Sequence, residues 1–227
     1  MKYKKKIIWI DVGTHFAQEY NSIFGTNISF FTYIFKRYIG GNIFGRGSSI
    51  NISGLKDIIQ TRIQIKKKQH FFYTIFVEAN HNIAREKNFY PFADLFFNLA
   101  IAENNKKSNS IIKLYLGDGE IYSQGSTIFK NKNGINKDKF VLTSSVSANA
   151  FFREIEIFLN EQFKNYVVLL RLNCEGVEDQ VIYSAHKHFQ KKLKLICGSL
   201  KDVRDIKGQH AFQKLEKYIT NNKISFV

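Results

Sequence analysis

The sequence has few cysteines and almost no proline. Its two cysteines, Cys174 and Cys197, lie in or just after apolar runs and are well separated in the chain. This pattern favours small packing residues over a disulfide framework or a metal-binding motif, and it suits a reducing, cytoplasmic setting. We therefore predict no metal site. The one proline, Pro91, follows a predicted strand and is expected in a loop.

Long apolar runs are also missing. No run approaches the roughly 20 residues that a helix needs to span a bilayer, so we expect no transmembrane segment. The start, MKYKKKIIWI, is basic and then apolar, as in a signal peptide, but Asp11 ends the apolar part early and no small-residue cleavage site follows. We interpret it as a solvated basic lead into the first strand.

Acidic residues are scarce. Lys and Arg number 34 against 19 Asp and Glu, which gives a net charge of +15. Such a charge favours an acidic partner, which would be nucleic acid, an anionic membrane or a phosphorylated substrate. Compositional drift is the alternative, because lysine far outnumbers arginine and the basic residues are mostly dispersed. The aromatic platform that RNA modules use is not recognisable, so nucleic acid is possible as a partner but not favoured.

What the sequence does contain is a set of buried strands that end in polar turns. Residues 167–172 are mostly apolar, as in a strand buried on both faces, and the acidic turn 173–178 follows. Residues 7–10 lead in the same way to Asp11 and Gly13, and residues 71–77 lead to Glu78. Ligands of open parallel sheets bind beyond the carboxyl ends of the strands. The pattern predicts one α/β domain over 1–227, with a nucleoside-binding half of Rossmann type.

Further elements follow from periodicity and turn residues. We expect a strand over 93–103 that pairs with a strand over 111–116, and a loop over 117–134. The remaining expected elements are helices over 14–24, 148–163, 177–189 and 208–221, and strands over 140–147, 193–197 and 224–227.

An insertion is expected between the first helix and the second strand. Gly13 and Glu78 are separated by 64 residues, whereas roughly 20 separate the glycine turn from the ribose-binding acid in a compact unit. We assign the insertion to 25–69, with helices over 28–39 and 54–68 and a glycine- and serine-rich loop over 40–53. It is either a pair of helices packed on the sheet edge, or a substrate lid, dimer element or membrane-surface patch.

Three motifs carry a family resemblance. D-V-G-T-H-F-A from Asp11, E-A-N from Glu78 and L-N-C-E-G-V-E from Leu172 resemble, in this order, the motifs of the FkbM-type S-adenosylmethionine-dependent methyltransferases. Residues 198–203 also resemble a late segment of some members. The resemblance implies a Rossmann-like class I methyltransferase fold, S-adenosyl-L-methionine as cofactor, and O-methylation of a hydroxyl on a sugar or glycan. The acceptor would be a small molecule or glycan, including a phosphate-bearing one.

The resemblance also implies the site residues. Cofactor contacts would come from the first strand and its turn, from the end of the second strand, and from Ala100 as part of the adenine border. Glu175 and Glu178 would act as general base or hold substrate hydroxyls, beside Asn173. The full set is Asp11, Gly13, Thr14, His15, Glu78, Ala79, Asn80 and Ala100 for the cofactor, Glu175, Asn173 and Glu178 for catalysis, and Ser123, Ser126 and Thr127 for the substrate.

The chain departs from the family pattern at several positions. Thr14, His15 and Ala17 stand where the family has Ala, Asn and Gly, Asn173 stands where Asp is frequent, and the proline after the second-strand acid is missing. Two alternatives therefore stay open. One is an RNA methyltransferase, suggested by the charge, and the other is a non-catalytic binding or scaffold protein on a degenerate methyltransferase fold.

Overall fold

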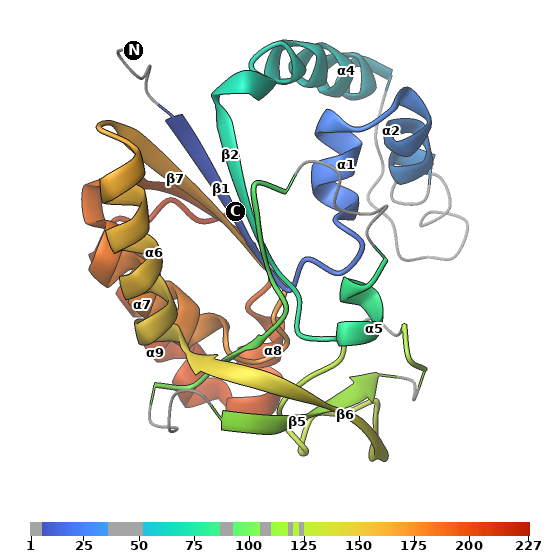
Figure 1. The fold of residues 1–227 in the computed structure, drawn as a ribbon, viewed down its shortest axis with the longest axis vertical. Helices are drawn as coiled ribbons and strands as arrows, with labels where there is room; N and C mark the ends of the chain where they lie inside the picture. The colour runs from blue at the N-terminus through green and yellow to red at the C-terminus, as the bar shows by residue number, and fades with distance from the viewer. Residues whose placement is uncertain (1–5, 36–51, 87–92, 105–109, 118–119, 123–124) are drawn as a thin grey trace.

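A five-stranded parallel sheet forms the centre of the molecule (Figure 1). The computed structural model describes residues 6–35, 52–86, 93–104, 110–117, 120–122 and 125–227. The sheet has the order β3-β2-β1-β7-β8, and every neighbouring pair is parallel. The strands are β1 (Lys6–Val12), β2 (Phe72–Val77), β3 (Leu95–Phe97), β7 (Tyr166–Leu172) and β8 (Leu193–Gly198). The predicted α/β architecture with a parallel central sheet is confirmed.

Helices cover both faces of this sheet. On one side lie α6 (Ala148–Gln162), α7 (Glu178–Phe189), α8 (Lys201–Lys207) and α9 (Gln209–Asn221), and on the other lie α1 (Gln18–Phe24), α2 (Asn27–Ile34) and α4 (Ile52–Lys66) (Figure 1). Two short 3₁₀ turns, Gln69–Phe71 and Gln190–Lys192, precede β2 and β8, and a short helix, α5 (His81–Ala84), follows β2.

Two apolar clusters hold these layers together. Alternate residues of β1, such as Ile8 and Ile10, are fully buried against Phe152 and the rest of the larger cluster, which includes α6 and α7 residues. On the opposite face, Tyr20 and Phe24 of α1 pack on β2. Side chains alternate between the two faces of a strand, so the residue after Ile10, Asp11, faces the α1 side.

A second, smaller sheet lies below the carboxyl ends of the main strands (Figure 1). It has the order β4-β6-β5, with β4 (Ala100–Ala102) parallel and β5 (Ser110–Gly117) antiparallel to the central β6 (Ile135–Ser147). The expected strand over 93–103 is thus wrong as a single strand. It is two short strands, β3 and β4, in different sheets, and the break lets Asn98 donate a side-chain hydrogen bond to the Glu78 carbonyl. The expected pairing with 111–116 is also wrong, because β6 lies between β4 and β5.

Other expectations differ at their boundaries. The first helix begins at Gln18 instead of residue 14, because His15 and Ala17 have left-handed backbone angles with φ 50° and 49°. The helix α8 was not predicted. The final segment makes one parallel bridge, between Phe226 and Ile196 on the edge of β8.

In the insertion, α2 and α4 are helical, whereas most of the expected loop over 40–53 lies outside the described residues. None of the helices in the described part of the chain is long and apolar enough to cross a bilayer.

Candidate active site

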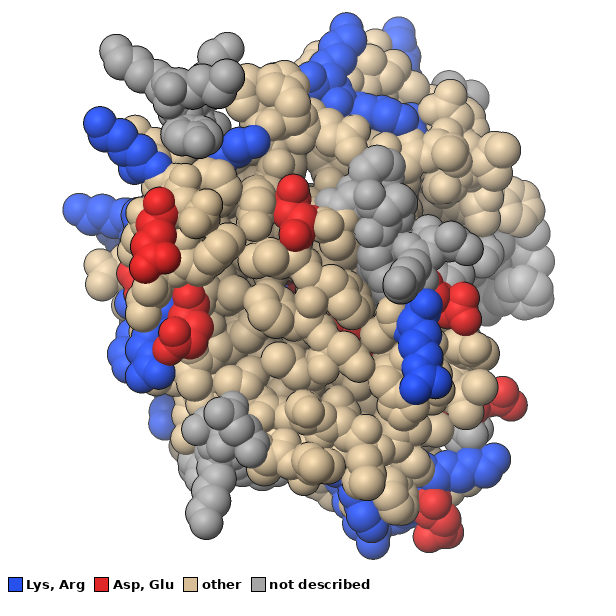
Figure 2. All heavy atoms as spheres, viewed as in Figure 1, with Lys and Arg blue, Asp and Glu red and all other residues tan. Residues whose placement is uncertain are grey.

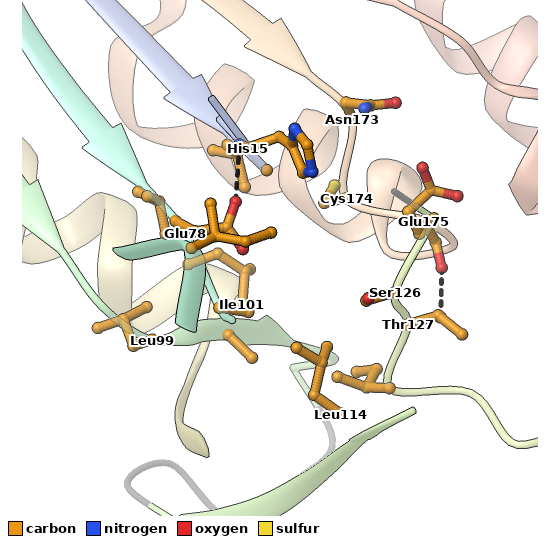
Figure 3. Close-up of a pocket in the computed structure, with 18 residues that line it drawn as sticks. His15, Glu78, Leu99, Ile101, Leu114, Ser126, Thr127, Asn173, Cys174 and Glu175 are labelled. Carbon is orange, nitrogen blue, oxygen red and sulfur yellow. Dashed lines mark hydrogen bonds between the residues drawn. The ribbon is translucent and has the colours of Figure 1, made fainter. Parts of the chain in front are cut away.

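A pocket opens where the carboxyl ends of β1, β2 and β7 meet the smaller sheet (Figure 3). The cavity has a volume of about 70 Å³ and is open to solvent, so a small-molecule ligand would also occupy the space at its mouth. Its polar lining comes from the turn after β1, from Glu78 after β2, from the turn after β7 and from the loop 125–128. The pocket therefore lies where the strand order reverses between β1 and β7, the position at which open α/β sheets bind ligands.

Gly13 forms the closest approach between two of these turns. Its φ is +77°, and a β-carbon at this position would lie 2.0 Å from the carbonyl oxygen of Asn173. The Gly13 N–H donates to the Val77 carbonyl over 2.9 Å, and the Asn173 N–H donates to the Val12 carbonyl over 2.9 Å. Only glycine fits here, so the exposed backbone of the β1 turn borders the pocket directly.

The two residues after Gly13 have different roles. Thr14 is buried away from the pocket, where its hydroxyl donates to the Asp11 carbonyl over 2.8 Å and accepts from the Val77 N–H at 3.3 Å. His15 lines the pocket, and its backbone N–H donates to Glu78 over 2.7 Å. Burial lowers the pKa of the His15 ring, whose Nε2 lies 3.2 Å from the Tyr122 carbonyl. Direct contact with a bound ligand is thus open to His15 but not to Thr14.

Asp11 does not line the pocket, which corrects the expected cofactor contact. Its fully buried carboxylate pairs with Arg171 at 3.0 Å, and the same guanidinium donates to the Gly13 carbonyl over 2.9 Å and pairs with Glu19 at 3.0 Å. Burial raises the pKa of Asp11, and the charge of Arg171 opposes this rise. The Asp11–Arg171 pair therefore supports the turn at Gly13 from the face of the sheet that α1 covers. Arg171 was not identified from the sequence as a site residue, although a charged residue inside an apolar strand was a signal that could have found it.

Glu78 is the buried acid of the pocket. One carboxylate oxygen accepts the His15 N–H at 2.7 Å, and the other accepts the Asn80 N–H at 2.8 Å. Burial, with a smaller contribution from the Asp11 charge, raises the pKa of Glu78 to about 7 despite these bonds. A carboxylate has about four acceptor positions, so acceptor capacity remains for a ligand hydroxyl.

Of the two residues that follow Glu78, one lines the pocket and the other does not. Ala79 lines the pocket. Asn80 is fully buried and does not, which corrects its expected cofactor role. Its side chain caps α5 by accepting from the Asn82 N–H at 3.1 Å and donates to the Ile121 carbonyl over 2.7 Å. Asn80 therefore fixes the shape of the pocket wall.

The turn after β7 brings Asn173, Cys174 and Glu175 to the pocket, on the side opposite Glu78 (Figure 3). Glu175 has a left-handed φ of 57°, and its carbonyl accepts the Thr127 hydroxyl at 2.6 Å. Its carboxylate is paired with Lys132, whose ammonium also lies 3.2 Å from Asp202 of α8. Burial raises the pKa of Glu175, and Lys132 opposes this rise. Nothing in the sequence indicated Lys132.

Glu178 lies behind the turn that follows β7, and Cys174 lies within it. Glu178 is buried at the start of α7, where it accepts the Gly176 N–H at 2.8 Å, and it does not line the pocket. The expected catalytic contact of Glu178 is therefore corrected to a hydrogen bond within the turn that precedes α7. Burial raises the pKa of Glu178 to about 7. Burial and the nearby carboxylates raise the pKa of the Cys174 thiol well above its ordinary value, which keeps it protonated and a poor nucleophile.

The remaining wall is apolar. It includes the predicted Ala100 and its neighbour Ile101, which begin β4, and further side chains that were not predicted: Leu99, Leu114 and Ile128. Ser126 and Thr127, which are predicted substrate contacts, line the pocket, whereas Ser123 lies outside the described residues.

The site combines three kinds of surface. An apolar wall, a buried carboxylate and a backbone turn surround one cavity. Within the part of the chain that the structure describes, no group of three or more His, Cys, Asp and Glu side chains is placed to hold a metal. Comparisons of the chain with protein-family models, with curated proteins and with solved structures found no match.

Proposed function

We propose that the chain is an S-adenosylmethionine-dependent methyltransferase that methylates a hydroxyl of a sugar or glycan. The observation that carries the proposal is the position of Glu78, whose carboxylate is held by two backbone N–H groups at the end of β2 and faces the pocket. A carboxylate at the end of the second strand is suited to accept the two hydroxyls of a ribose.

The other walls suit the rest of the cofactor. Ala100, Ile101 and Leu114 offer an apolar surface for an adenine ring. The backbone of the Gly13 turn, free of any side chain, leaves room for the aminoacyl part at the carboxyl end of β1. The strand order β3-β2-β1-β7-β8 supports the same assignment, because the pocket lies at its switch point.

Bound S-adenosylmethionine would supply an electrophilic methyl group on a sulfonium centre. For a hydroxyl acceptor, the chain must orient the oxygen and take up its proton. Glu175 is our candidate base, because the residue lines the pocket and the neighbouring Lys132 favours its ionised form against the effect of burial. Asn173, which replaces an acid of the family pattern, has no basic group, so it can orient the acceptor but not deprotonate it.

Transfer of a labelled methyl group tests the proposal. Wild-type protein is incubated with methyl-labelled S-adenosylmethionine and a panel of monosaccharides, oligosaccharides, sugar phosphates and RNA, and label in each acceptor is counted. We expect label in at least one carbohydrate and a loss of roughly a hundredfold or more with Glu175→Gln, the typical contribution of a general base. The exposed Glu154 on α6 provides the matched control, Glu154→Gln. Label in RNA but in no carbohydrate would overturn the acceptor class.

A further inference from the structure

The outer face of α2 carries an exposed apolar stripe. Phe30 and Ile34 are buried on the inner face, whereas Ile28, Phe31 and Phe35 have exposed fractions of 79%, 57% and 56%. These three residues are spaced by three and four positions, so they line one side of the helix. A contiguous apolar row on the solvent side of a helix is typical of a face that protein or lipid covers. The apolar stripe Ile28–Phe31–Phe35 therefore indicates a surface that another apolar phase covers.

Basic residues of α4 are fixed beside this helix. The Arg62 guanidinium donates to the Asn27 side chain over 3.0 Å and to the Thr26 carbonyl over 3.1 Å, and it lies over the Phe30 ring. The Lys66 ammonium donates to the Gly25 carbonyl over 2.6 Å. The last turn of α4 is thus attached to the amino end of α2.

The lysines that follow this attachment face solvent. Lys67 and Lys68 are exposed, as is Lys56 on an earlier turn of α4. Figure 2 shows Lys and Arg side chains along the α4 edge and mostly uncharged surface toward α2. Apolar side chains beside exposed lysines form the combination by which amphipathic surfaces enter the headgroup region of anionic bilayers.

We propose that α2 and the carboxyl end of α4 form a docking surface for an anionic lipid bilayer. Ile28, Phe31 and Phe35 insert at the boundary between headgroups and acyl chains, and Lys67 and Lys68 contact the anionic headgroups. Charge selects this occupant over a second copy of the chain, because pairing two copies would bring two net charges of +15 together. The surface is separate from the pocket, whose described lining includes no residue of α2 or α4.

Vesicle sedimentation tests the apolar part of the proposal. The protein is mixed with vesicles of phosphatidylcholine alone and of equal parts phosphatidylcholine and phosphatidylglycerol. We expect binding to the anionic vesicles, and a loss of about tenfold or more with Phe31→Gln/Phe35→Gln because the inserted apolar area is gone. The matched control is Ile111→Gln/Leu142→Gln, which removes two exposed apolar side chains of the smaller sheet. The control should bind like wild type, and circular dichroism confirms that each variant is folded.

A second pair of variants tests the charge. Lys67→Gln/Lys68→Gln should weaken binding by about fivefold for each lysine removed. Lys214→Gln/Lys217→Gln removes the same charge from exposed positions of α9 and should change binding little.

Three results would overturn the proposal. The first is no binding to anionic vesicles, and the second is an equal loss in a variant and its control. The third is a different partner for the same surface: a dimer in light scattering that Phe31→Gln dissociates, or RNA binding that requires Lys67 and Lys68 in the absence of vesicle binding. None of these measurements uses methyl transfer, so they stand or fall independently of the proposed function.

Discussion

A β-carbon on Gly13 would lie 2.0 Å from the carbonyl oxygen of Asn173, so the turns after β1 and β7 meet backbone to backbone. We expect Gly13→Ala to destabilise the fold by about 3 kcal/mol or more, because it adds this overlap to the cost of a left-handed alanine. Urea unfolding measures the change. Gly134→Ala is the control, because Gly134 has nearly the same φ of +78° with nothing within 4 Å of the added carbon. Its cost should be about 1 kcal/mol, and equal losses at both positions would show that the contact with Asn173 is loose.

Arg171 compensates a fully buried charge on Asp11. Arg171→Met should destabilise the fold by about 3–5 kcal/mol, because the carboxylate is left buried without its partner. In the double variant Asp11→Asn/Arg171→Met the unpaired charge is gone, and we expect about half of the loss to be recovered. Denaturant unfolding of both single variants and the double variant measures the coupling. Strictly additive losses would contradict the pairing.

Glu178 gives stability a pH dependence of known sign. Its pKa rises from an ordinary 4.5 to about 7 in the folded protein, because burial penalises the ionised form. Between these two values the folded state binds more protons than the unfolded state, so the contribution of Glu178 to stability falls as the pH rises and the penalty is complete above about 7.

The variant Glu178→Gln should remove this penalty while its amide oxygen still accepts the Gly176 N–H. We expect the variant to gain up to about 3 kcal/mol relative to wild type between a pH below 4.5 and a pH above 7. Urea unfolding at both ends of the range measures the gain, with Glu154→Gln as the exposed control. A difference between Glu178→Gln and wild type that does not change with pH would contradict the burial of an ionised Glu178.

Glu78 should couple cofactor binding to pH. Its pKa in the unliganded protein is about 7, and ribose hydroxyls donate to the ionised form. Affinity for S-adenosylhomocysteine should therefore fall as the pH drops below about 7, by up to about tenfold for each pH unit. Calorimetric titrations across this range measure the effect. Glu78→Gln should bind weakly and without this dependence, and a flat profile in wild type would separate Glu78 from the ligand.

The buried strands and the acids at their ends were predictable from sequence, whereas side-chain direction was not. Gly13, Glu78 and Glu175, three of the predicted site residues, line the pocket, because each follows the last residues of a recognisable apolar strand. Asp11 was misplaced because the face of the sheet to which its side chain points depends on the alternation along β1. Glu178 was misplaced because its carboxylate turns back to accept a hydrogen bond from the Gly176 N–H. These outcomes depend on local geometry that residue types alone do not specify.

Contacts between distant segments were the other limit. Lys132 lies in a loop 43 residues before Glu175, and only the folded chain brings the two together. The smaller sheet was misassigned for a similar reason, because β6 enters between β4 and β5 although it follows both in sequence.

Calorimetric titration with S-adenosylhomocysteine measures cofactor binding without any knowledge of the acceptor. We expect micromolar binding by wild type at a pH above 7, a loss of about tenfold or more in Glu78→Gln from the missing charged acceptor, and no change in Glu154→Gln. Absence of binding by wild type would contradict the proposed methyltransferase function and would favour a non-catalytic binding protein on this fold. Binding that Glu78→Gln leaves intact would contradict the assignment of the pocket.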